Sequence, residues 1–212
     1  MTTLTAPYGS FATSDRTMVR KIAIIRALHL GDLLLAVPAV RAIRRGFPAA
    51  EITLIGLRWS AEFARRFCRY IDRWREFPGY PGLREVDVDL ARTQQFLEAA
   101  QRYRYDLVLA LHGNGTVSNQ LALDLQGKRT VGFYVDSAPD GMFAGAPYPE
   151  SLHEIHRNLA LVKLLGLAGD DDRLEFPALP EDEASLEAVL PSGSLTVRPS
   201  VGLHPGARSP AR

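Results

Sequence analysis

One acidic residue, Asp32, stands where its carboxylate could act as a general base. It follows Gly31 in the turn after the first apolar run of the chain, Lys21–Arg26. In an open parallel sheet, ligands bind outside the carboxyl ends of the strands, and a carboxylate held there can take a proton from an incoming hydroxyl group. Gly31 would permit a tight turn and a close approach of that ligand. Aspartate is also a favoured helix cap, worth about 1 kcal/mol, so both roles stay open for Asp32.

Three further polar side chains follow strand ends that we expect at the same edge. His112 and Asn114 come directly after an apolar run at 105–111, where they could contact a substrate or simply form the turn before the next helix. Arg58 follows a second apolar run at 51–57. It could bind an anionic acceptor, or it could be an ordinary surface cation. We predict Gly31, Arg58, His112 and Asn114 as acceptor-binding residues.

Other kinds of site are disfavoured. The turn at Asp32 lacks the three-glycine dinucleotide pattern, and no phosphate-cradling P-loop occurs, which weakens an oxidoreductase or NTPase interpretation. His153, Glu154 and His156 have a spacing that can hold a metal on a helix, but no third ligand is evident, so we predict no metal site. Asp170–Asp172 lacks the spacing of a calcium loop and is predicted to be a solvated linker.

The net charge of +1 hides an uneven distribution. Residues 20–75 hold twelve Arg or Lys against four acids, whereas residues 76–212 hold twelve bases against nineteen acids. A basic N-terminal half could attract an anionic acceptor or a lipid headgroup surface, or it could be ordinary solvated surface. Nucleic acid is not expected as a partner, because no binding motif accompanies the charge.

The compartment is predicted from what the sequence lacks. Cys68 is the single cysteine, so no intrachain disulfide can form, and its simplest role is that of a small core residue. No apolar run reaches the roughly 20 residues of a membrane span, and Arg26 interrupts the one candidate for a signal-peptide core. We therefore expect a cytoplasmic protein.

Short apolar runs alternate with helical ones, which is typical of an α/β fold with a mostly parallel, Rossmann-like sheet. Residues 134–150 contain Pro and Gly at intervals and are predicted to form an irregular loop. We expect strands at residues 21–26, 51–57, 73–77, 105–111 and 129–133. We expect helices at residues 32–45, 61–70, 90–103, 114–125, 151–167 and 181–190.

The expected domains are a flexible tail at 1–17, an α/β domain at 18–178, a linker with a short helix at 179–198, and a strand and turn at 199–212. A lone strand after a linker has nothing following it to cover its faces. It therefore suggests the beginning of an incomplete second domain, although it could instead add to the edge of the first sheet.

Five segments together carry a family resemblance. The run IIRALHLGDLLLAVPAVRAIRRGFPAAEITLIG resembles the N-terminus of family 9 glycosyltransferases, the ADP-heptose:lipopolysaccharide heptosyltransferases. YDLVLALHGN, VGFY, HEIHRNLALVKLLGL and VGLHPGARSPAR also fall in the order and spacing of that family. The resemblance covers roughly residues 19–212.

The resemblance implies a two-domain GT-B fold, with the acceptor in the N-terminal domain and the nucleotide-sugar donor in a C-terminal domain that is truncated here. Such enzymes invert the anomeric carbon, and Asp32 matches the family's catalytic base. His204, Pro205, Gly206 and Ser209 match the donor-binding turn, although Arg208 stands where a smaller residue is commoner and a Lys-Trp-Pro-like continuation is missing. We therefore expect this chain alone to be inactive.

The implied partners are ADP-heptose as donor, with no other cofactor, and a lipopolysaccharide-core glycan as acceptor. Peripheral contact with the cytoplasmic face of the inner membrane fits such an acceptor. Two alternatives from other classes stay open: a glycan-binding module without chemistry, and a nonfunctional gene remnant.

Overall fold

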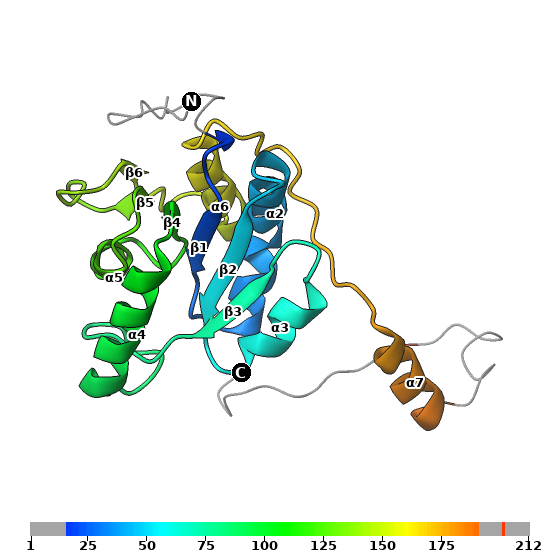
Figure 1. The fold of residues 1–212 in the computed structure, drawn as a ribbon. Coiled ribbons are helices and arrows are strands. Elements are labelled where there is room, and N and C mark those ends of the chain that lie inside the picture. The colour runs from blue at the N-terminus through cyan, green and yellow to red at the C-terminus, as the bar shows by residue number, and fades with distance from the viewer. Residues whose placement is uncertain (1–15, 191–200, 202–212) are drawn as a thin grey trace. The chain divides into compact units, whose positions relative to one another are not determined.

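The computed structural model describes residues 16–190 and Val201. The chain divides into two compact units, Met1–Phe176 and Pro177–Arg212. The first unit is a six-stranded parallel sheet with helices on both faces, which confirms the predicted Rossmann-like α/β fold (Figure 1). The second unit contains one helix among its described residues, α7 (Pro180–Val189).

The strands and helices alternate through most of the first unit. The strands are β1 (Lys21–Ile25), β2 (Glu51–Gly56), β3 (Arg73–Glu76), β4 (Leu107–Ala110), β5 (Thr130–Tyr134) and β6 (Ala144–Pro147). The helices are α2 (Leu30–Gly46), α3 (Ser60–Arg66), α4 (Leu90–Tyr103), α5 (Ser118–Asp124) and α6 (Glu154–Lys163).

The strand order is β3-β2-β1-β4-β5-β6, and every neighbouring pair is parallel. The central strand is therefore β1, where Ile25 pairs with Ile55 of β2 and with Ala110 of β4. Because these pairs lie at the last residues of their strands, the segments after β1, β2 and β4 emerge side by side. The topology thus brings the segments that begin at Arg26, Leu57 and Leu111 to one edge.

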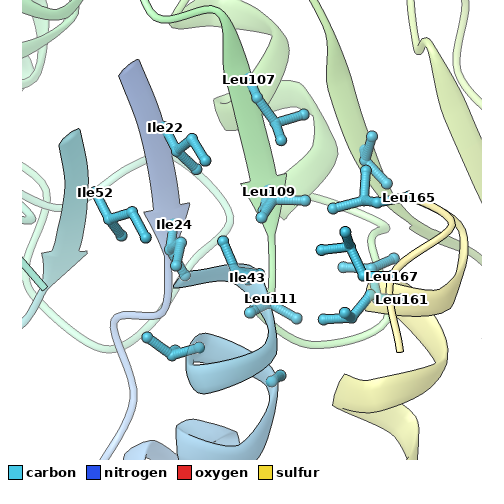
Figure 2. Packing of buried hydrophobic residues seen from close by; sticks show 14 of the residues in the cluster. Ile22, Ile24, Ile43, Ile52, Leu107, Leu109, Leu111, Leu161, Leu165 and Leu167 are labelled. Carbon is cyan, nitrogen blue, oxygen red and sulfur yellow. The ribbon is translucent and has the colours of Figure 1, made fainter. Parts of the chain in front are cut away.

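Side chains of β1 alternate between the two faces of the sheet, and both faces are buried. Ile22 and Ile24 join the core on the face covered by α2, α3 and α6, while Ala23 and Ile25 join the core under α4 and α5. Figure 2 shows Ile22 and Ile24 of β1 together with Ile43 of α2 in one cluster of buried side chains. Positions covered on both faces need apolar residues, which is why Ile22, Ala23, Ile24 and Ile25 form a continuous apolar run rather than an alternating one.

Helix α2 carries the predicted catalytic residue in its first turn. It is 17 residues long, packs against α6, and buries Leu33, Val37 and Ile43. Asp32 lies near its N-terminus, while Arg44 and Arg45 lie in its last turn. Each charge suits the helix dipole at its own end.

Residues 168–176, here called the strap, run along α2 and α3 and are tied to them by charge. Arg41 is buried and pairs with Asp171 and Glu175, each at 2.9 Å. Phe176 packs edge-on against Phe67. Asp171, predicted to lie in a solvated linker, instead belongs to this ion-pair network, and part of the basic N-terminal half is structural.

Three sequence-based expectations about local structure are wrong. Residues 134–150 contain β6, because pairing with β5 holds the small residues of AGAP in an extended edge strand despite their low strand propensity. Cys68 is exposed rather than in the core. Helix α5 begins at Ser118 instead of residue 114, because Gly113 and Gly115 have φ values of 62° and 91°.

Asp106 ties the start of β4 to the start of β1. Its carboxylate accepts hydrogen bonds from the backbone N–H groups of Arg20 and Lys21, at 2.8 and 3.0 Å, and from Lys128 Nζ at 2.7 Å. Burial opposes ionisation of this carboxyl group, but these donors outweigh burial and lower its pKa.

We expect Asp106→Asn to lower the free energy of unfolding at pH 7 by about 1–2 kcal/mol. A carboxyl group whose pKa is lower in the folded state stabilises the fold above its unfolded pKa of about 3.9, and this contribution disappears as the pH falls through the folded value. Urea unfolding at pH 7 and at decreasing pH should therefore show the two proteins converging in acid. A constant difference at every pH would contradict this assignment.

Candidate functional site

The candidate site lies where the segments after β1 and β4 meet the first turn of α2. Asp32 is half-buried there, and its Oδ2 accepts a hydrogen bond from the backbone N–H of His29 at 3.2 Å. The N-cap residue of α2 is His29, so Asp32 does not occupy the cap position itself but supplies the capping-box carboxylate from the third helical position. Within the described part of the chain no other hydrogen bond to this carboxylate is found.

A buried guanidinium group supports the turn that carries Asp32. Arg26 is 2% exposed, and its Nε donates to the backbone oxygen of Asp32 at 2.8 Å. Its Nη1 donates to the backbone oxygen of Leu111 at 2.6 Å and to Asn158 Oδ1 at 3.2 Å. Arg26 thus joins the ends of β1 and β4 to the first turn of α2 and to α6.

The negative partner of Arg26 is Glu154, in the first turn of α6. Glu154 Oε1 lies 2.9 Å from Arg26 Nη2, and its Oε2 lies 2.6 Å from Arg157 Nη1. Burial lowers the pKa of Arg26, and the hydrogen bond and charge of Glu154 oppose that effect. The buried positive charge of Arg26 is therefore balanced by Glu154, and Arg26 is hydrogen-bonded to the turn that carries Asp32.

His112 lies beneath the same edge with both ring nitrogens engaged. Its Nδ1 accepts from the backbone N–H of Ala27 at 3.2 Å, and its Nε2 lies 3.2 Å from Glu85 Oε1. Nδ1 as acceptor requires the proton on Nε2, and burial lowers the pKa of His112, so the ring is neutral. A direct contact between His112 and an acceptor would have to replace one of these hydrogen bonds.

The other residues predicted to bind the acceptor follow β2 and β4 or lie in the first turn of α2. Arg58 is exposed in the turn between β2 and α3. Asn114 is exposed and accepts from the backbone N–H of Thr116 at 3.1 Å, which fixes a tight turn. Gly31 is exposed and helical, so no tight turn requires it, contrary to expectation. A Cβ atom at Gly31 would meet nothing within 4 Å, so the surface there is open.

An open hollow adjoins the site at the ends of β2 and β3. Its volume is ≈ 600 Å³. Arg58 and Trp59 line it on one side, and Glu76 and Glu85 on another. Glu85 also contacts His112, so the hollow and the buried centre share one carboxylate.

The predicted donor-side residues His204, Pro205, Gly206 and Ser209 lie outside the described residues, as does all but Val201 of the strand expected at 200–204. Between residues 16 and 190, no group of three or more His, Cys, Asp or Glu side chains could hold a metal ion. Over the same part of the chain, no helix combines the length and apolar character needed to cross a membrane.

Sequence reasoning missed two residues that organise the site, Arg26 and Glu85. The role of Arg26 could have been suspected from the sequence, because a charged residue there ends a strand that is otherwise buried on both faces. Such a residue needs a buried partner, which the sequence could not identify as Glu154, 128 positions away. Glu85 gave no signal, because it lies in a loop without regular secondary structure.

The Rossmann-like fold is similar to about half of each of several solved glycosyltransferase structures. No protein-family model and no curated protein sequence matches the chain. A glycosyl transferase family 9 structure from Veillonella parvula matches with a TM-score of 0.58 and 19% identity, covering 80% of this chain and 48% of that one. The E. coli heptosyltransferase WaaC with ADP-2-deoxy-2-fluoro heptose matches with a TM-score of 0.56 and 17% identity, covering 73% of this chain and 51% of that one.

The structure of WaaC with ADP gives a similar result, with a TM-score of 0.53 and 19% identity. The chain therefore spans about half the length of the structures it resembles. At these sequence identities the similarity shows the shared fold, but a shared fold does not by itself identify the reaction.

Gly31 offers a test of close ligand approach that leaves the fold intact. Gly31→Ala places a methyl group in open space on a helical residue, so stability should stay the same or rise by roughly 0.5–1 kcal/mol. If an acceptor lies against this turn, the same methyl group should weaken its binding. Thermal unfolding and acceptor titration of the variant separate the two effects. An unchanged acceptor affinity would show that the acceptor does not lie against Gly31.

Proposed function

We propose that this chain is the acceptor-side domain of an inverting GT-B glycosyltransferase, with Asp32 as its general base. The observation that carries the proposal is the position of the Asp32 carboxylate. It lies at the carboxyl edge of a Rossmann-like sheet, with one oxygen fixed by the backbone of His29. The similarity to half of each matched glycosyltransferase structure supports the same assignment.

In the proposed reaction, Asp32 takes the proton of an acceptor hydroxyl group. The acceptor oxygen attacks the anomeric carbon of the donor sugar, and the bond from that carbon to the nucleotide diphosphate breaks. The nucleoside diphosphate leaves with the bonding electrons, and the configuration at the anomeric carbon inverts. Arg26 contributes by holding the turn that carries Asp32, through its hydrogen bond to the Asp32 backbone oxygen.

The proposed donor is ADP-heptose, since WaaC, one of the matched proteins, was solved with a fluorinated analogue of that compound. The proposed acceptor is a lipopolysaccharide-core glycan, bound near Gly31, Arg58, His112 and Asn114. Donor binding is assigned to a second domain whose first strand and turn we expect at residues 199–212, with His204, Pro205, Gly206 and Ser209 as donor-binding residues. We also propose a cytoplasmic location with peripheral contact to the inner membrane, where such an acceptor would be met.

The test is sugar transfer by the complete natural protein that contains this chain. Purified protein, ADP-heptose and a lipopolysaccharide-core acceptor are incubated, and the acceptor is examined by mass spectrometry for the mass of one added heptose. Transfer that depends on Asp32 supports the proposal. Acceptor binding without transfer would favour the alternative of a glycan-binding module.

A further inference from the structure

The hollow at the ends of β2 and β3 has the size and lining of a small-molecule site. Its volume of ≈ 600 Å³ lies within the range of roughly 300–1,000 Å³ found for such sites. Leu57, Phe77 and Val86 supply apolar surface. Trp59, the residue before α3, lines the hollow and is 38% exposed, so part of a large flat ring faces solvent.

Two carboxylates and one guanidinium group supply the charge that lines the hollow. Glu76 lies 3.5 Å from Arg92, but both side chains are exposed, so that pair is weak. Glu85 Oε1 faces the neutral ring of His112, and its buried Oε2 has no hydrogen-bond partner among the described residues. With Arg58 as the single cation, the lining carries a net negative charge.

This combination of groups selects against an anionic ligand. A second negative charge placed beside Glu76 and Glu85 would be repelled, whereas hydroxyl groups can donate hydrogen bonds to Glu76 and to Oε1 of Glu85, which has a second lone pair besides the one that faces His112. The indole of Trp59 offers an apolar surface for the C–H face of a sugar ring. Arg58, predicted from the sequence as a candidate for an anionic acceptor, can instead donate to ring or hydroxyl oxygens.

We propose that the hollow binds an uncharged, hydroxyl-rich sugar ring, stacked on Trp59 and hydrogen-bonded to Glu76 and Glu85. That this ring belongs to the acceptor rests on the proposed function. The binding itself does not, because it requires neither a donor nor a second domain. It is therefore measurable even where no transfer occurs.

The chain has two tryptophans, Trp59 and Trp74, so two indole N–H signals report on binding in a ¹H–¹⁵N NMR titration. Trp74 Nε1 donates to Ser60 Oγ at 2.9 Å and serves as the internal reference. The probes are glucose, galactose and mannose, each paired with its uronic acid. The indole signal of Trp59 is identified as the one that is absent in Trp59→Phe. At least one neutral sugar should shift this signal, and the corresponding uronic acid should bind at least about fivefold more weakly than that sugar.

Two pairs of variants test the lining of the hollow. Trp59→Ala should abolish the binding, measured from backbone amide signals, whereas Trp74→Phe should retain it. Glu85→Gln should reduce the preference for the neutral sugar, whereas Glu98→Gln, on the exposed surface of α4, should leave it unchanged. Absence of binding by all three neutral sugars, or equal binding of the uronic acids, would overturn the inference. Sugar binding without any transfer would support the inference about the hollow and would contradict only the proposed function.

Discussion

In a protein that also carries the proposed donor-binding domain, replacing Asp32 with asparagine is expected to lower the rate of sugar transfer by roughly 10²–10⁴-fold, the usual contribution of a general base. Asparagine keeps the size of the side chain and an oxygen that can accept from the His29 backbone N–H, as Asp32 Oδ2 does at 3.2 Å. It cannot take a proton from an acceptor hydroxyl at neutral pH. The first turn of α2 should therefore persist while the chemistry is lost.

The variant also separates the two roles left open for Asp32. If the residue is only a cap, Asp32→Asn should leave transfer almost unchanged, because asparagine caps helices about as well as aspartate. Transfer is measured by mass spectrometry of the acceptor, and the fold is checked by circular dichroism and thermal unfolding. Full activity in a folded variant would exclude Asp32 as the base.

Replacing Arg26 with methionine should lower the free energy of unfolding by about 3–5 kcal/mol, the cost of breaking a buried ion pair on one side. The change removes the donors that serve the backbone oxygens of Asp32 and Leu111. It also leaves Glu154 without one of its two cationic partners. Methionine fits the apolar part of the space but satisfies none of these acceptors.

The matched control is Arg102→Met, because Arg102 is exposed on α4 and its side chain is 72% accessible. Its stability should change by less than about 0.5 kcal/mol. Urea unfolding at pH 7 gives both values. If Arg26→Met were as stable as the control, the guanidinium group could not be the element that joins the strand ends to α2 and α6.

The sequence allowed the layered α/β fold to be predicted because the sheet is covered on both faces. Burial on both faces forces uninterrupted apolar runs such as 22–25 and 107–110, and these are visible without a structure. Helix α4 was predicted with its observed bounds, since Asp89 caps it and Arg104 ends it in a left-handed conformation. Edge strand β6 was missed because its pairing with β5, rather than its own residues, makes it extended.

The site could be predicted only in part, for a related reason. Asp32 lies in the first turn of the helix that follows the first strand, so the rule for parallel sheets predicts that it lies at the ligand-binding edge. Two partners of Arg26, Leu111 and Glu154, lie 85 and 128 positions away, and nothing local to Arg26 identifies them. The role of Glu85 depends on the path of a loop, which has no periodic pattern from which to predict it.

The exposed position of Cys68 gives the protein a single chemical handle. Since the sequence contains one cysteine and the structure leaves it accessible, a maleimide fluorophore or a nitroxide spin label should attach at one defined point without mutagenesis. Cys68 is the second residue after α3, and the intervening Phe67 is buried in the core, so the label would be anchored next to a well-packed part of the domain. Movements of other parts of the protein relative to the sheet could then be measured from a fixed reference.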